Sequence, residues 1–328
     1  MNQRTPDQSR RAILDYLDRL SAEFVQRREV LEMMAVALAA KEPMLLLGPP
    51  GTAKSDMVIK FSRGLGLREH DYFEYMINAF TEPSEILGPV DIRALRDEGE
   101  YRRMLEGKIA VAKVVFLDEI FNGNSAILNT LLTIMNERKV YQAGTTLYLD
   151  HLVGFFAATN QIPERTELDA LKDRFVIKVE LGQIHATSFP ELVSAGIRAD
   201  VNSAQNRTPW IVPEAVTLED FAAIRRFVHR KIHENFDTQT GRVRLPEPVM
   251  NKFFYLTQEL ESKGVEITDR EVIKLLKVIV VAGYLLNGHL PDSITDQDLF
   301  VLRYLGETHE QFVEVRQCVN DALGIVED

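Results

Sequence analysis

Apolar residues recur along this chain with two different periods, and the alternation between them predicts layers of helices around a sheet. Between residues 7 and 40 the apolar positions are spaced by three and four, which is typical of helices; they include Val30, Leu31, Met34, Ala35 and Leu38. A short, fully apolar run, Met44 to Leu47, follows and predicts a buried strand. Met57, Val58 and Phe61 then predict another helix, which glycines at 64 and 66 should end.

The same reading continues to about residue 160. We expect strands at YFEYMIN (72–78), at VVFLDEI (114–120) and at LVGFFAATN (152–160), with a helix over residues 126–137. Residues 139–149 alternate around Gly144, as in a hairpin. Residues 94–108 are charged and have little core pattern, so we expect an insertion that projects from the sheet.

The second half of the chain has a different character. Residues 195–213 are polar and contain Pro209 and Pro213, which indicates a linker. From Thr217 onward the pattern is helical, with helices expected at 218–235, 246–262, 269–286 and 310–323. The predicted organisation is an αβα domain over residues 1–200, with inserts near 89–108 and 139–149, a linker at 201–216 and a helical domain over 217–328.

Composition limits the classes of protein to consider. The chain has 328 residues, 45% of them hydrophobic, and 38 basic against 49 acidic residues give a net charge of −11. Without a basic block, this balance argues against nucleic acid as a partner. The single cysteine, Cys318, excludes an intrachain disulfide. The N-terminus lacks the apolar stretch of a signal peptide, and Lys274 and Lys277 interrupt the most apolar segment, 272–286, so we expect a cytoplasmic protein without membrane insertion.

The first candidate for chemistry is the loop that follows the strand at 44–47. The segment LLLGPPGTAKS, residues 45–55, leads from a buried strand through a Gly/Pro turn into a helix. Backbone N–H groups in such a loop, together with a helix N-terminus, attract phosphate oxygens. Lys54 would contact the β and γ phosphates, and Ser55 would bind Mg²⁺. The predicted nucleotide-binding residues are Gly48, Pro49, Pro50, Gly51, Thr52, Ala53, Lys54 and Ser55.

One position departs from the usual phosphate-loop pattern. Ala53 stands where the second glycine of GxxxxGK[ST] is expected. Because only glycine enters the positive-φ region freely, we expect the backbone at Ala53 to avoid that region.

The second candidate is the acidic end of the strand VVFLDEI. Asp118 would complete the metal shell with Ser55, because Mg²⁺ prefers hard oxygen ligands. Glu119 would orient and polarise the water that attacks the γ-phosphate. Together, the two segments predict an Mg²⁺-dependent nucleoside triphosphatase.

Several blocks of this sequence resemble the MoxR family of AAA+ ATPases, and within it the RavA-like branch. They are GPPGTAKS, VVFLDEIFNGNSAILNTLLTIMNER, FFAATN, LKDRF, FEYMINAFTEPSEILGP, DIRALRDEGEY and ITDREVIKLL. The resemblance extends from about residue 20 to about residue 305. It implies ATP as the nucleotide, a P-loop AAA+ core with a parallel sheet between helices, and an all-helical lid. The chain has no counterpart of the C-terminal extension known in RavA-like proteins, so functions that depend on it are not expected.

The resemblance also implies roles for residues that the pattern alone leaves open. Asn160 would be the first sensor beside Glu119, and Arg174 would be an arginine finger acting on a neighbouring subunit. Arg270 matches the second sensor, and Asn78 would be a polar switch for Glu119. A finger acting in trans requires assembly, and the resemblance implies a homo-hexamer whose inserts face substrate or partner.

Each of these residues also has an ordinary structural interpretation. Asn160 could form a turn, Arg174 a helix cap or surface ion pair, and Arg270 an exposed charge. His229 and His233 could share a metal in geometry, but an exposed helix face is the more common arrangement. Glu137 and Arg138 fit either a subunit interface or an exposed pair.

The leading function is an ATP-driven remodelling chaperone that matures a client protein together with a von Willebrand factor A domain partner, as the resemblance implies. The alternatives are a nucleic-acid motor or loader, a small-molecule P-loop kinase, and a nucleotide-dependent structural switch with little turnover. The acidic composition disfavours the nucleic-acid motor. A kinase would have no use for Asn160, Arg174 and a lid that carries Arg270, and an intact Glu119 disfavours the switch.

Overall fold

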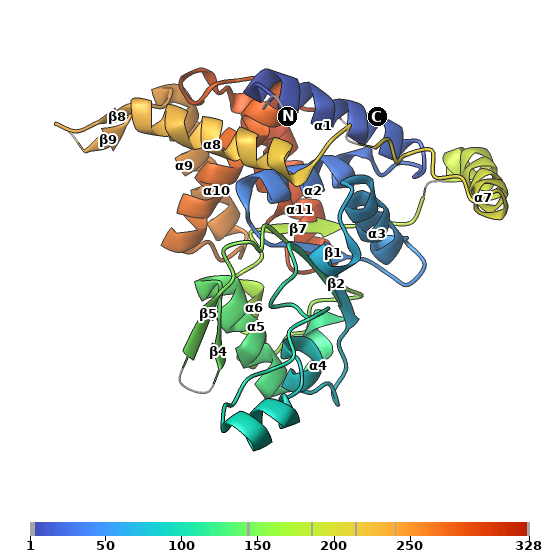
Figure 1. Ribbon diagram of the computed structural model, residues 1–328. Helices are drawn as coiled ribbons and strands as arrows, with labels where there is room; N and C mark the ends of the chain where they lie inside the picture. The colour runs from blue at the N-terminus through green and yellow to red at the C-terminus, as the bar shows by residue number, and fades with distance from the viewer. Residues whose placement is uncertain (1–3, 143–144, 185, 214, 240, 327–328) are drawn as a thin grey trace.

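Five parallel strands form the central sheet of the computed structural model, which describes residues 4–142, 145–184, 186–213, 215–239 and 241–326 (Figure 1). The strand order is β2-β3-β6-β1-β7. The bounds are β1 Met44–Leu47, β2 Tyr72–Met76, β3 Val114–Asp118, β6 Gly154–Thr159 and β7 Ile177–Glu180. The α/β class with a parallel sheet is therefore confirmed. Strand β7 has no counterpart in the sequence prediction, because Lys178 interrupts its apolar run; the structure buries that lysine and pairs it with Glu307 at 2.7 Å.

Helices cover both faces of the sheet, since its strands are apolar on both sides. Successive side chains of a strand point to opposite faces. Met44 and Leu46 of β1 accordingly pack in a core with α2 (Arg28–Ala40) and α3 (Lys54–Gly64), whereas Leu45 and Leu47 pack in a second core with α5 (Ser125–Glu137). The helices predicted at 7–40, after Lys54 and at 126–137 are confirmed.

Two projecting segments lie at the lower end of the molecule in Figure 1. One follows the short helix α4 (Pro83–Leu87) and contains the π-helical turn η2 (Ala94–Glu98) and an isolated bridge between Val90 and Arg103. The other is the antiparallel hairpin of β4 (Lys139–Gln142) and β5 (Thr145–Tyr148), which confirms the predicted hairpin. Gly144, around which it was expected to turn, lies outside the described residues.

The C-terminal region is helical and packs against the N-terminal helix. It contains α8 (Leu218–Glu234), α9 (Glu247–Ser262), α10 (Asp269–Ala282) and α11 (His309–Leu323). A small hairpin, β8 (Phe236–Asp237) with β9 (Arg242–Val243), departs from the all-helical expectation. Ser9 of α1 (Pro6–Ser21) donates to Asp220 at 2.8 Å, and Arg10 donates to the carbonyls of Tyr284 and Leu286 at 2.8 Å each. Tyr16, also on α1, donates to the carbonyl of Phe61 on α3.

The segment between the sheet and α8 contains a helix that the sequence did not predict. Helix α7 spans Phe189–Ala204, so the first four residues of the expected linker, 201–204, are helical. No residue of α7 is buried, and in Figure 1 the helix projects from the body of the molecule. The polarity of this stretch reflects its exposure rather than a lack of structure. The domain boundaries at 201 and 216 stay a prediction.

The remaining short helices connect these elements. They are η1 Glu69–Asp71, η3 Ile120–Asn122, η4 Thr166–Leu168, α6 Asp169–Lys172, η5 Ala186–Ser188, η6 Gly283–Asn287, η7 Pro291–Ser293 and η8 Asp296–Tyr304. Within the described ranges, no helix is both long and apolar enough to cross a membrane.

Candidate functional site

The loop between β1 and α3 has the geometry of an anion-binding site. In the described part of the chain, no protein acceptor pairs with the backbone N–H groups of residues 51–56. Such unpaired donors at a helix N-terminus attract anionic oxygens. Gly48, at φ 151°, could not carry a side chain without strain, because a Cβ there would lie 2.5 Å from the carbonyl oxygen of Leu181. The loop therefore approaches the segment after β7 more closely than any other residue would allow.

The backbone at Ala53 contradicts the sequence prediction. Ala53 precedes α3 with φ 64° and ψ 25°, in the left-handed region that we expected it to avoid. An L-residue enters this region at a cost of about 1–2 kcal/mol. The turn from the loop into α3 imposes the conformation, and the exposed methyl group of Ala53 meets little steric opposition. The alanine thus adopts the left-handed conformation that glycine enters freely.

Lys54 is 7% exposed and lies at the centre of the loop. Its Nζ donates to the carbonyl oxygens of Gly48 and Pro49 at 2.5 and 3.2 Å, and to Asn160 Oδ1 at 3.0 Å. Burial lowers the pKa of the ammonium group, while the charges of Asp118 and Glu119 oppose that shift. The lysine thus connects the phosphate loop to the end of β6.

Ser55 and Asp118 meet where α3 begins and β3 ends. The Ser55 hydroxyl donates to Asp118 Oδ2 at 2.8 Å, and Asp118 Oδ1 accepts from the backbone N–H of Glu119 at 3.0 Å. A hydroxyl and a carboxylate are hard oxygen donors of the kind that Mg²⁺ prefers. The two side chains fit that ion.

Glu119 is held by two amide side chains. Asn160 Nδ2 donates to Glu119 Oε1, and Asn122 Nδ2 donates to Oε2 at 3.3 Å. Burial, followed by the neighbouring charge of Asp118, raises the pKa of Glu119. Its backbone has φ 53°, a strained conformation for a residue other than glycine, and such conformations concentrate at functional sites.

Of the two asparagines that contact Glu119, only one was predicted from the sequence. Asn160 was predicted beside Glu119, and the structure places it there. Asn122 was missed, although it stands only three residues after Glu119. The expected switch residue, Asn78, accepts from the backbone N–H of Phe80 at 2.8 Å, no hydrogen bond joins it to Glu119 within the described residues, and its role as a switch stays a prediction.

A cavity of about 480 Å³ opens beside the phosphate loop. Its walls come from the loop itself, from the connection between α1 and α2, and from one face of α7; they include Phe24, Val25, Arg27, Ile184, Leu192, Ala195, Gly196 and Ala199. Lys60 is also in the cavity wall, and its Nζ lies 5.0 Å from the centre of the Phe24 ring and 4.9 Å from the centre of the Trp210 ring. Apolar walls next to an anion-binding loop suit the base and sugar of a nucleotide. Sequence reasoning missed these wall residues because no single motif contains them.

Arg174 and Arg270 lie together, away from the phosphate loop. The positive charge of Arg270 contributes to lowering the pKa of Arg174, although burial is the larger cause. The pKa of Lys274, one turn further along α10, is also lowered, mainly by burial, and the charges of both arginines contribute to that shift. Arg174 Nε is buried without a hydrogen-bond partner among the described residues. Neither arginine lines the cavity beside the loop, and α10 lies on the opposite side of the molecule from α3 and α7 in Figure 1.

Comparison with known proteins decides the family. Residues 11–220 match the family model described as the MoxR domain in the MoxR-vWA-beta-propeller ternary systems. The chain belongs to the MoxR family of AAA+ ATPases. Membership of the MoxR family, together with the ATPase-like fold, makes it a chaperone-type AAA+ ATPase.

Relatives in other organisms cover much of this MoxR chain. The uncharacterized protein MJ0812 of Methanocaldococcus jannaschii is 29% identical over 312 residues, which are 94% of this chain and 76% of that protein. Chaperone MoxR1 of Mycobacterium tuberculosis is 26% identical over 226 residues, covering 68% of this chain and 57% of that protein. The crystal structure of an ATPase candidate from Cytophaga hutchinsonii superimposes with a TM-score of 0.70 at 18% identity, covering 98% of this chain and 96% of that one.

Two other predicted features are separate from the phosphate site. The rings of His229 and His233 lie 4.5 Å apart, but within the described residues no third metal-binding side chain joins them. Arg138 donates to the carbonyls of Lys41 and Leu152 at 3.2 Å each, while Glu137 pairs with Lys139. The first observation favours an exposed histidine pair, and the second gives Arg138 a structural role in tying α5 to neighbouring loops.

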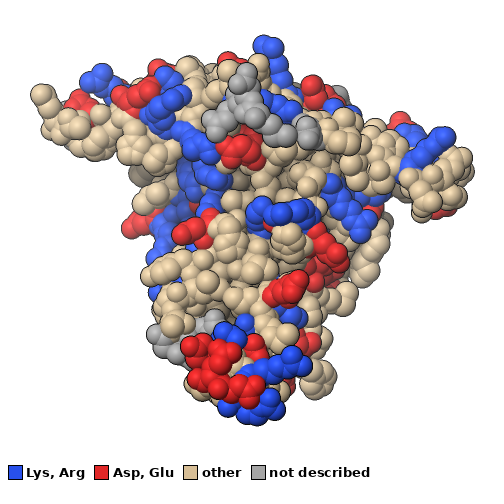
Figure 2. Space-filling model, in the orientation of Figure 1, with Lys and Arg blue, Asp and Glu red and all other residues tan. Residues whose placement is uncertain are grey.

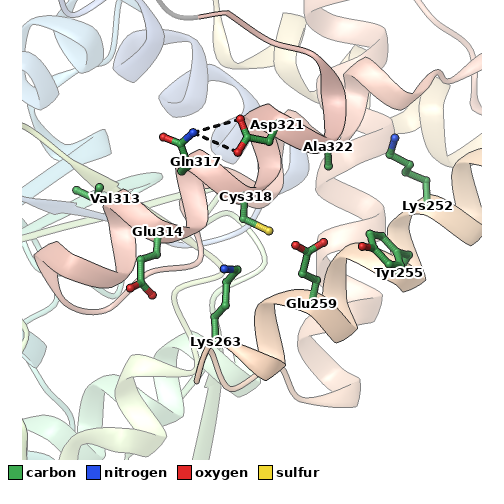
Figure 3. A pocket seen from close by; sticks show the side chains of 10 residues that line it. All are labelled: Lys252, Tyr255, Glu259, Lys263, Val313, Glu314, Gln317, Cys318, Asp321 and Ala322. Atoms are coloured by element: carbon green, nitrogen blue, oxygen red, sulfur yellow. Dashed lines mark hydrogen bonds between the residues drawn. The ribbon is translucent and has the colours of Figure 1, made fainter.

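A second cavity, of about 570 Å³, lies between α9 and α11 (Figure 3). Its lining side chains are mostly charged or polar, and Cys318 points into it between Glu259 and Lys263. Burial, reinforced by Glu259, raises the pKa of Cys318 to about 11. Because the thiolate is the reactive form, this cysteine is a poor nucleophile at neutral pH.

Proposed function

We propose that this MoxR chain hydrolyses ATP to ADP and phosphate in an Mg²⁺-dependent reaction and uses the energy to remodel a client protein. One observation carries the proposal: the Ser55–Asp118 and Glu119–Asn160 pairs converge beside a loop in which the backbone N–H groups of residues 51–56 have no acceptor among the described residues. A phosphate chain is the ligand that these unpaired donors fit. A carboxylate with a raised pKa beside it is the group that hydrolysis requires.

Binding follows from the loop. The donors of residues 51–56 and the ammonium group of Lys54 would hold the phosphates, while the cavity lined by α7 would take the base and sugar. Lys54 now donates to loop carbonyls and to Asn160, so it would exchange these bonds for phosphate oxygens. Ser55 and Asp118 would hold Mg²⁺, which when bound neutralises phosphate charge as a Lewis acid.

Glu119 would act as the general base. A water oxygen forms the new bond to the γ-phosphorus, the bond to the β–γ bridging oxygen breaks, and the water proton moves toward Glu119. Asn160 holds Glu119 Oε1 and also accepts from Lys54, so one amide connects the base with the phosphate-binding cation. An amide can both donate and accept, which suits a sensor of the γ-phosphate.

Arg174 would serve a neighbouring subunit as an arginine finger, and Arg270 beside it would be the second sensor, which couples the nucleotide state to the position of the helical lid. They lie apart from the phosphate loop of their own chain, and a guanidinium stabilises phosphoryl charge through paired hydrogen bonds. Head-to-tail contacts of this kind close into rings, and we propose a homo-hexamer.

The partner assignment rests on the family. The matching model describes MoxR domains that occur with vWA proteins, so we propose a von Willebrand factor A domain partner and a protein client in the cytoplasm. The RavA-like branch stays a prediction. The projecting segments at 89–108 and 139–149 carry exposed apolar side chains, among them Ile92, Tyr101, Met104, Tyr141 and Tyr148, and are proposed as contact surfaces.

The test is ATPase activity per subunit against protein concentration, with mass recorded by light scattering in the same samples and Glu119→Gln as the blank. We expect activity per subunit to rise as rings form. Mixing Arg174→Ala with Glu119→Gln subunits should restore part of the activity, because one variant supplies the base and the other supplies the finger. Activity that is independent of assembly would contradict shared sites, and nucleotide binding without turnover would favour a structural switch.

A further inference from the structure

Asn122 contacts Glu119 through both its backbone and its side chain. The Asn122 N–H donates to the carbonyl oxygen of Glu119 at 2.9 Å, which closes the turn η3. Its amide Nδ2 donates to Glu119 Oε2 at 3.3 Å. Ile120 and Phe121, the two residues between them, are buried. The core therefore fixes the turn that brings Asn122 back to the carboxylate.

The two asparagines that hold Glu119 differ in what else they contact. Asn160 bonds Oε1 and also accepts from Lys54, the cation that would turn to phosphate oxygens when a nucleotide binds. The Asn122 side chain has no second hydrogen-bond partner in the part of the chain that the structure describes. Binding of phosphate would therefore disturb the hold on Oε1 and leave the hold on Oε2 in place.

We propose that Asn122 is a positioning residue for Glu119: it holds Oε2 in place, so that Oε1 stays directed toward the phosphate loop when a nucleotide binds. This inference rests on the proposed function, in which Glu119 activates water. The terminal torsion of a glutamate side chain is broad, so a single donor leaves the carboxylate free to turn. A second donor prevents that, and the efficiency of a general base depends on its alignment.

The fold itself does not require an asparagine at this position. The φ of Asn122 is negative, which any residue can adopt, and the bond from its N–H needs no particular side chain. The side chain is exposed, so its loss leaves no cavity. Asn124, two residues later, has a structural task by contrast, because it caps α5 by accepting from the N–H groups of Ala126 and Ile127. An exposed amide whose side chain bonds the carboxylate of the proposed base points to a role in the reaction.

Two substitutions at this position test the proposal in single-turnover hydrolysis of saturating ATP. Asn122→Ala should lower the rate about tenfold or more, because a hydrogen bond to a charged group is lost. Asn122→Asp keeps the shape of the side chain and should lower the rate further, since its carboxylate repels that of Glu119. The dissociation constant of a fluorescent ATP analogue and the thermal midpoint should both stay at the wild-type values, since the side chain belongs to neither the phosphate loop nor the core.

Asn129→Asp is the matched control, because Asn129 is an exposed asparagine on α5 and the change of charge is the same. Figure 2 shows acidic side chains scattered over the visible face of the molecule, so one more carboxylate on the surface is a small change in itself. The control should hydrolyse ATP at the wild-type rate.

A third variant separates the amide donor from the rest of the side chain. Asn122→Gln keeps the donor and should retain more of the rate than Asn122→Ala; an equal loss in both would overturn the inference. So would an Asn122→Ala rate within twofold of wild type. A slower rate accompanied by an equal loss of ATP affinity or by a lowered midpoint would make Asn122 a structural residue instead. Wild-type protein that neither binds nor hydrolyses ATP, or Glu119→Gln with full turnover, would refute the proposed function itself.

Discussion

Replacement of Ala53 by glycine should stabilise the protein, although glycine usually destabilises. The native φ of 64° costs an L-residue about 1–2 kcal/mol, and glycine has no such cost. Against this, glycine loses about 0.4–1 kcal/mol more conformational entropy on folding. The methyl group of Ala53 is exposed, so its removal leaves no cavity. We expect a net gain of about 0.5–1 kcal/mol, which in a chain of this length raises the thermal midpoint by roughly 1–2 °C.

The assay is thermal unfolding of Ala53→Gly beside a matched control, Ala223→Gly in the middle of α8. Glycine at the control position should destabilise by about 1 kcal/mol, because its helical backbone gains nothing from glycine. Both substitutions remove one methyl group, from an exposed residue at position 53 and from a half-buried residue in α8, so the expected pattern is a raised midpoint for Ala53→Gly and a lowered one for Ala223→Gly. Nucleotide affinity should stay unchanged in Ala53→Gly. If both variants lower the midpoint, the left-handed conformation at Ala53 is refuted.

Three further predictions concern individual side chains. Lys54→Ala should weaken ATP binding about 10- to 100-fold in a fluorescence titration, since a charge-assisted hydrogen bond is lost; undiminished affinity would remove the lysine from the phosphate site. Glu119→Gln should keep ATP affinity and lose turnover by about 100-fold or more. Because the pKa of Glu119 is raised, wild-type turnover should begin to fall, on acidification, at a higher pH than an ordinary glutamate would produce, and a profile flat down to the usual glutamate range would argue against this base. Alkylation of Cys318 by iodoacetamide should be slow at neutral pH and rise about tenfold per pH unit below its pKa of about 11; fast reaction at pH 7 would contradict the burial of the thiol.

Much of the fold could be predicted because apolar spacing is a local property. The strands around Leu46 and Phe116 are apolar on both faces, and so the sequence alone indicates that they are buried. Strand β7 could not be found in this way, since its Lys178 is neutralised by Glu307, which is 129 residues away. Helix α7 was hidden for the opposite reason: it has no buried face from which a core pattern could arise.

In the candidate site, too, residues within short segments could be predicted, whereas contacts and backbone angles that depend on the fold could not. Lys54, Ser55, Asp118 and Glu119 stand in two short segments, and parallel strands bring the ends of those segments to one edge of the sheet. The contact between Asn160 and Glu119 was expected from the family resemblance rather than from spacing. The φ of Ala53 depends on the turn that connects β1 with α3. Residue type alone predicted a negative φ, whereas the observed φ is positive.

The contacts of helix α1 determine how motion can pass through this molecule. Through Ser9 and Arg10 it is fastened to the C-terminal helices, and through Tyr16 to α3, the helix that begins at Lys54. A lid attached only by its linker could swing freely when the nucleotide changes, whereas this one is braced to the phosphate helix at a second point. These bonds predict that the C-terminal helices and α3 move together when the nucleotide changes, with α1 as the brace between them.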